Sequence, residues 1–232
     1  MYVRVGGGAD WPQGERFEDV DDCSTRQPAA LFGCGPGYDG KAIGAAGSFR
    51  TTPVLDAAVG YRLNSWLRTE ALLSWRPDMA FSGQSNFRGR VVGRNQPVSG
   101  SLASLSGFGV AYADLPRLGS LRPFLGAGLG VASNSLGAMT YRFPSISSKA
   151  STTTPGGQRT DLAYLLTAGI SVPLNPRLDL DLSYRFTDLG SVSTDSGQAL
   201  IVRPARRRSI TIGGTTADLR AHGVMLGLRY AF

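Results

Sequence analysis

The chain has few residues of the kinds that carry metal or nucleophilic chemistry. Its 232 residues include two cysteines and a single histidine. A structural zinc site takes four Cys or His ligands, more than this chain contains, so we predict neither a metal nor a cofactor. A catalytic triad would need a nucleophile held beside His222, and nothing in the sequence fixes Ser209 or Thr211 in that place. We therefore predict no catalytic residues.

Long apolar runs are also missing, which excludes a transmembrane helix, because that needs about 18 consecutive apolar residues. The formal net charge is +7, which raises the question of nucleic acid. The arginines are scattered singly through the chain, however, apart from Arg206, Arg207 and Arg208. Without a basic helix or a basic and aromatic platform, we predict no nucleic-acid partner.

The two cysteines lie close together in a loop-like stretch, DDCSTRQPAALFGCG. Their number and spacing favour a disulfide between Cys23 and Cys34 in an oxidising compartment over two free thiols. Closing a loop of roughly a dozen residues would stabilise the fold by about 2–3 kcal/mol in the chain-entropy model.

What the chain has in abundance is two-residue alternation of apolar with small or charged side chains. In residues 177–188, RLDLDLSYRFTD, leucines and aromatics occupy one parity, and Asp, Ser, Arg and Thr occupy the other. This period indicates a strand with one apolar face. Eight segments share the pattern: residues 1–8, 54–63, 66–76, about 102–115, about 121–133, 161–174, 177–188 and 217–232.

The connections between these segments alternate in length. Short turns at 64–65, 116–120 and 175–176 alternate with long loops at about 9–50, 77–101, 134–160 and 189–216. This is the pattern of outer-membrane barrels, whose short turns are periplasmic. We predict an all-β, single-domain fold over residues 1–232: an eight-stranded antiparallel transmembrane up-and-down β-barrel with long extracellular loops.

The apolar faces are expected to point outward into lipid. A soluble barrel of the lipocalin type would turn them inward, and the leucines and aromatics of eight strands would overfill so narrow an interior. For the segment at 102–115, this reasoning places Phe108, Val110 and Tyr112 outside and the intervening glycines inside. It also places Tyr2 in an aromatic girdle at the periplasmic edge.

The opposite faces would then form a charged lumen. Isolated buried charges cost several kcal/mol each, so these groups must pair. A salt-bridged plug and a gated ion path are the two interpretations, and the narrow diameter of eight strands favours the plug. The predicted lumen network consists of Asp56, Arg62, Arg68, Glu70, Arg76, Arg122, Asp179, Asp181, Arg185 and Arg229.

The densest charge run lies in the last long loop and contains Arg203, Arg206, Arg207 and Arg208. Guanidinium groups bind phosphate well. We therefore expect these side chains to contact lipopolysaccharide phosphates, with a simple solvated loop tip as the alternative.

Three motifs carry a family resemblance: VGYRLNSWLRTE, LDLSYRFTDLG and the terminal LGLRYAF. The chain resembles small bacterial outer-membrane β-barrels of the OmpA-like, Opa-like or "porin family" type from Gram-negative bacteria. The resemblance implies a cell-surface protein in the outer membrane. It also implies that Tyr230 and Phe232 form the signal read by the barrel-assembly machinery. We expect an export leader to have been removed, because residue 2 already begins a strand.

The function expected from this resemblance is non-enzymatic: a structural or surface-interaction role. Its partners would be outer-membrane lipids, lipopolysaccharide and possible proteins reached through the loops. A small diffusion pore is the alternative. A lipid-modifying enzyme is a third interpretation, because the chain is similar in size to barrel-shaped lipid A deacylases. Those enzymes use a His-x-Ser pair, however, and here His222 is followed by Gly223 and Val224.

Overall fold

The computed structural model describes residues 1–21 and 28–232. Cys23 lies outside the described residues, so the Cys23–Cys34 disulfide stays a prediction. The described residues form fourteen strands, and none forms a helix long and apolar enough to span a membrane.

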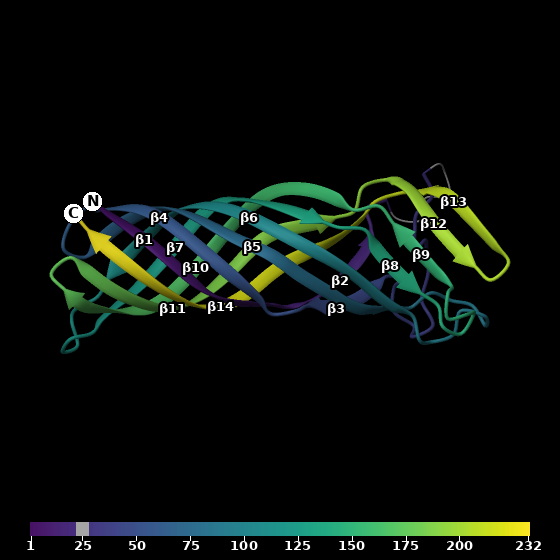
Figure 1. Ribbon diagram of the computed structural model, residues 1–232, viewed down its shortest axis with the longest axis horizontal. Helices are drawn as coiled ribbons and strands as arrows, with labels where there is room; N and C mark the ends of the chain where they lie inside the picture. The colour runs from purple at the N-terminus through teal and green to yellow at the C-terminus, as the bar shows by residue number, and fades with distance from the viewer. Residues whose placement is uncertain (22–27) are drawn as a thin grey trace.

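Eight of the strands close into a barrel (Figure 1), which confirms the predicted fold class. Consecutive barrel strands pair antiparallel, and β1 pairs with β14 from Tyr2↔Ala231 to Pro12↔Ala221 to close the ring. Both termini lie at the end that carries the short connections. The barrel strands are β1 (Tyr2–Pro12), β4 (Thr52–Arg62), β5 (Leu67–Ser85), β6 (Pro97–Asp114), β7 (Arg122–Leu136), β10 (Gly157–Asn175), β11 (Leu178–Ser193) and β14 (Thr215–Ala231).

The first predicted loop, about 9–50, is partly barrel wall. Beyond the ends of β1 and β4, the wall continues through β2 (Gly14–Asp19) and β3 (Ala45–Phe49). These two strands pair with each other, while β2 also pairs with β14 and β3 with β5. The eight-stranded ring therefore extends well past the segment in which sequence alternation is visible.

The other predicted long loops, about 77–101, 134–160 and 189–216, also contain strands. The barrel strands run on into them, and β8 (Met139–Arg142), β9 (Ser151–Thr154), β12 (Gly197–Arg203) and β13 (Arg206–Ile212) extend the sheet beyond the barrel end that lies opposite the termini (Figure 1). These extensions have no uniformly apolar outer face, so apolar and polar residues no longer alternate along their sequences, although the strands still pair through backbone hydrogen bonds. That is why their sequences resemble loops.

The facing predicted for β6 is wrong. Phe108, Val110 and Tyr112 are buried inside the barrel, while Gly109 is exposed on the outer wall. β6 carries no charge in this stretch that would mark its inner face. The aromatic and branched side chains fill the interior beside the ionic network, and the glycines leave the outer face of the strand nearly bare. Tyr2 is likewise buried inside and does not belong to an outer girdle.

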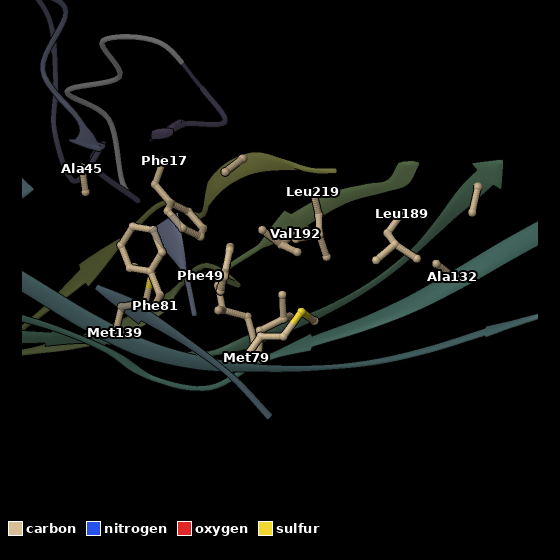
Figure 2. Close-up of a cluster of buried hydrophobic side chains, with 14 of the residues drawn as sticks. Phe17, Ala45, Phe49, Met79, Phe81, Ala132, Met139, Leu189, Val192 and Leu219 are labelled. Atoms are coloured by element: carbon tan, nitrogen blue, oxygen red, sulfur yellow. The ribbon is translucent and has the colours of Figure 1, made fainter. Parts of the chain in front are cut away.

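The interior has two layers. The half of the barrel remote from the termini is filled by an apolar core (Figure 2) in which Phe17, Phe49 and Phe81 pack edge to face, with ring centroids 5.1–6.5 Å apart. Met79 and Leu219 are fully buried in the same core. The half nearer the termini holds the charged side chains. The alternation of the strands predicted a charged lumen, so the apolar layer is a finding of the structure.

Candidate functional site

The charged layer of the lumen contains four groups of ion-paired side chains. The group next to the apolar core is a single pair. Arg76 on β5 donates through Nε to Asp10 Oδ2 on β1 at 2.7 Å, and both side chains are at most 1% exposed. Arg76 also donates to the hydroxyl of Ser106 at 3.1 Å. The pair crosses the barrel interior between strands that are not neighbours.

The largest group centres on Glu70. Arg4 Nη2 lies 2.8 Å and Arg68 Nη1 lies 3.2 Å from its carboxylate, and the Tyr112 hydroxyl donates to it at 3.2 Å. Arg68 also binds Asp114 Oδ1 at 3.0 Å and stacks on the ring of Tyr112, with 4.1 Å between the guanidinium carbon and the ring centroid. The inward turn of Tyr112 is therefore part of the electrostatic arrangement.

Two further groups complete the layer. Arg185 Nη1 lies 2.9 Å from Asp56 Oδ2, and Asp56 also accepts a 2.6 Å hydrogen bond from Ser74. Nearer the termini, Arg229 binds both Asp181 and Asp179, each at 3.1 Å. Arginine suits such sites because its planar fork can satisfy more than one acceptor at once.

Most residues of the predicted network lie in this layer, namely Asp56, Arg68, Glu70, Arg76, Asp179, Asp181, Arg185 and Arg229. Arg62 and Arg122 lie instead at the barrel rim near the termini. The prediction missed Arg4, Asp10 and Asp114. All three share strand parity with Tyr2 or Tyr112, which the alternation placed outside, so their own charge was the only signal of an inward position.

Little open space remains within the charged layer. A cavity of about 20 Å³ lies between Asp56, Arg68 and Arg185, which is room for about one water molecule. Above it, the apolar core fills the barrel. The ion pairs link strands across the lumen below the apolar core, and Arg68 Nη2, Arg76 Nη2 and Arg185 Nε are buried there without a hydrogen-bond partner among the described residues.

At the rim near the termini, the barrel opens into a second pocket of about 160 Å³. Four arginines and one aspartate line it together with residues at the end of β10 and in the following turn. They are Arg62, Arg117, Arg122, Arg229, Asp179, Ser171, Pro173, Asn175 and Pro176. We call this the rim pocket.

His222 lies on the outer face of β14, and both of its ring nitrogens have partners. The Tyr184 hydroxyl lies 2.5 Å from Nδ1, and the Gln13 side-chain amide lies 2.7 Å from Nε2. Phe186 packs beside the ring with 5.2 Å between centroids. Within the described residues, no group of three or more His, Cys, Asp and Glu side chains is arranged to hold a metal ion.

The arginines of the last predicted loop fall into two classes. Arg203 stacks on Phe143, with 5.0 Å between the guanidinium carbon and the ring centroid, and donates to the backbone carbonyls of Ser151 and Val202. Burial, with the neighbouring charge of Arg206, lowers the pKa of Arg203. Arg203 is thus engaged within the sheet, whereas Arg206, Arg207 and Arg208 are exposed on β13.

Comparison with known families identifies the chain at the level of its fold. A family model described as "Outer membrane protein beta-barrel domain" matches residues 2–232. The chain belongs to this family. The family assignment and the closed barrel confirm the predicted location in the bacterial outer membrane. The short-turn end that carries both termini is then periplasmic, and the projecting sheet is extracellular.

Relatives and solved structures agree with the family. Uncharacterized proteins of Brucella abortus and Brucella suis are 31% and 30% identical over 194 residues, which cover 75% of this chain and 66% of theirs. The outer membrane protein OprG from Pseudomonas aeruginosa aligns with a TM-score of 0.52 at 14% identity, over 100% of this chain and 95% of OprG. The outer membrane protease OmpT from Escherichia coli aligns at 0.51 and 8%, over 100% and 97%. These identities indicate a shared fold only.

Proposed function

We propose that this outer-membrane barrel has a non-enzymatic, surface-interaction role in which the arginine tip, Arg206–Arg208 on the β12–β13 hairpin, binds anionic groups outside the cell. The observation that carries the proposal is the position of this tip. Three consecutive exposed arginines lie just after the turn of a hairpin that projects away from the barrel (Figure 1).

The filled interior supports a surface role over a transport role. Ion pairs occupy the periplasmic half of the lumen and the apolar core occupies the extracellular half. Phe17 and Met79 of this core are completely buried. A function that depends on exposed side chains of the extracellular region is therefore better supported than transport through the lumen.

The arginine tip suits oxyanions. Arg206 lies opposite Arg203, and Arg208 lies opposite Ile201. Because successive side chains on a strand point to opposite faces, Arg206 and Arg208 share one face of the hairpin and Arg207 lies on the other. Arg203 is held by Phe143 and backbone carbonyls and adds no free charge to the tip. Exposed guanidinium groups spaced in this way can each bind a separate phosphate.

The height of the tip narrows the choice of anion. Each strand of the hairpin contains seven residues, which spans about 20 Å at about 3.3 Å per residue. Phosphates at the membrane surface lie below that reach. The tip is better placed for phosphorylated sugars that extend from lipopolysaccharide, or for an acidic surface on a partner protein.

A binding assay with a matched control tests the proposal. Arg206, Arg207 and Arg208 are changed together to Gln, and the control changes Arg88, Arg90 and Arg94, which are exposed in another extracellular segment. Both variants remove the same charge from the same side of the membrane. Each is reconstituted and titrated with lipopolysaccharide carrying phosphorylated core sugars, and with the same material after core dephosphorylation.

The expected result is at least about tenfold weaker binding for the tip variant and a small change for the control, because each lost charge-assisted hydrogen bond costs about 1.5–3 kcal/mol. Dephosphorylation should weaken the wild type and leave the tip variant unaffected. Equal losses in the two variants would indicate general electrostatic attraction and would contradict a specific role for the tip.

Two other functions are tested separately. A diffusion pore would give stable conductance steps in planar bilayers, and we expect none from a filled lumen. An enzyme acting on lipid A would change its mass spectrum when protein is added, and we expect an unchanged profile. The engagement of both His222 nitrogens supports that expectation.

A further inference from the structure

The arginines of the rim pocket differ from those of the lumen in how their charge is balanced. Arg4, Arg76 and Arg185 each have a carboxylate within 2.9 Å. In the part of the chain that the structure describes, neither Arg117 nor Arg122 forms an ion pair. The stability of the barrel does not explain two arginines without a carboxylate partner, because like charges in proximity repel.

The remaining rim arginines have little carboxylate to spare. Arg62 approaches Asp114 only at 3.9 Å, and that carboxylate is already bound by Arg68 at 3.0 Å. Asp179 lines the pocket but is bound by Arg229 at 3.1 Å. Arg122 is repelled by both Arg117 and Arg62. It is attracted by Asp114 and Asp179, the two carboxylates that other arginines already bind.

We propose that the rim pocket is a periplasmic binding site for a phosphate group. Its arginines come from separate elements, because Arg62 ends β4, Arg117 lies in the 115–121 turn and Arg122 begins β7. Guanidinium groups that converge from several directions match a tetrahedral oxyanion better than a planar carboxylate, which offers two oxygens. The excess of arginine over aspartate matches a phosphate monoester, which carries about −1.5 to −2 charges at pH 7.

The size and surroundings of the pocket fit this ligand. Its volume of about 160 Å³ is about ten times what one water molecule requires. The Arg229–Asp181 pair closes it on the lumen side with the Ser171 hydroxyl bound to both. A bound phosphate would therefore be held at the periplasmic face, and the site would be independent of the extracellular arginine tip.

Phosphorus NMR titration of the full chain in octyl glucoside micelles, which contain no phosphorus, tests the site with inorganic phosphate as the probe. The variant Arg122→Gln removes an unpaired charge from the pocket, and Arg177→Gln removes an exposed charge from the same periplasmic rim at a residue that does not line the pocket. We expect saturable binding that weakens about tenfold in the first variant, the loss typical of one charge-assisted hydrogen bond, and stays unchanged in the second.

Stability measurements separate binding from structure. Because Arg122 is repelled by its neighbours, Arg122→Gln should unfold in urea at the same concentration as the wild type or a higher one. Equal phosphate affinity in the wild type and Arg122→Gln, or no saturable binding at all, would overturn the proposal.

The source of the phosphate is distinguished by a second arm in phosphatidylglycerol vesicles. If lipid headgroups occupy the site, the wild type should bind inorganic phosphate more weakly in these vesicles than in micelles, and Arg122→Gln should show no such difference. This result would assign the site to a lipid headgroup. Unchanged affinity in the wild type assigns it to a soluble phosphate compound. Both outcomes support a phosphate site, provided that Arg122→Gln binds more weakly in micelles.

Discussion

Arg76 and Asp10 form an ion pair across the barrel interior, with 2.7 Å between Nε and Oδ2 and almost no solvent contact for either side chain. The pair lies where the charged layer meets the apolar core. Its partners come from β5 and β1, which are separated in the ring by β4. The two groups are thus a direct link between strands that share no backbone hydrogen bonds.

Removing one partner should be costly, because it leaves the other charge buried and unpaired. We expect Arg76→Gln to lower the free energy of unfolding by about 3–5 kcal/mol. The exposed pair of Arg159 with Asp161 provides the control, and Arg159→Gln should cost about 0–1 kcal/mol. Urea unfolding in lipid vesicles, followed by tryptophan fluorescence, measures both.

A double variant checks the physical reason. Replacing Arg76 by Met and Asp10 by Leu removes both charges and keeps apolar volume, so the double variant should lose less stability than Arg76→Gln alone. A double variant as unstable as the two single variants combined would contradict the pairing argument.

The close contact between β7 and β6 makes a second prediction. A Cβ built on Gly130 would lie 1.9 Å from the Gly107 carbonyl oxygen, whereas one built on Gly107 has no atom within 4 Å. Gly130→Ala should therefore force the backbone to shift, at a cost of about 1–3 kcal/mol, and Gly107→Ala should be tolerated. The same unfolding assay compares them, and equal stabilities would refute the close approach.

The sequence predicts this fold wherever one strand face is strongly polar and the other apolar. The alternation in residues 177–188 correctly gave β11 its facing, since Asp181 and Arg185 are buried within. In β6 the only charged residue is Asp114 at its end, and the facing of the rest depends on which side chains fill the space around Glu70. That requirement involves three strands at once, so local pattern could not reveal it.

The positions of the charged residues were also only partly predictable from the sequence. Parity within a strand identified the inward position of residues such as Glu70, but the vertical position that separates Arg122 at the rim from Arg185 in the lumen depends on strand register. The apolar core depends on Phe17 and Phe49, which lie in a segment that resembled a loop. Pairing of β2 and β3 in the barrel wall beyond the ends of β1 and β4, rather than alternation, brings them together.

The disulfide remains a third prediction. Non-reducing peptide mapping of the purified protein should yield a linked pair containing Cys23 and Cys34, and reduction should lower stability by about 2–3 kcal/mol in the chain-entropy model. Cys34→Ser should reproduce the effect of the reductant. Quantitative labelling of two thiols in the native, unreduced protein would contradict it.

The outward facing of β7 gives the last prediction. Leu129 is 76% exposed on the barrel wall, near the middle of its strand, where the wall meets hydrocarbon. Leu129→Arg should cost about 2–4 kcal/mol in lipid vesicles, because an arginine on the lipid face near the bilayer midplane loses its hydration. Leu200 is also exposed but lies on the extracellular β12, so Leu200→Arg should have almost no effect. Comparable losses in the two variants would show that Leu129 does not face the hydrocarbon.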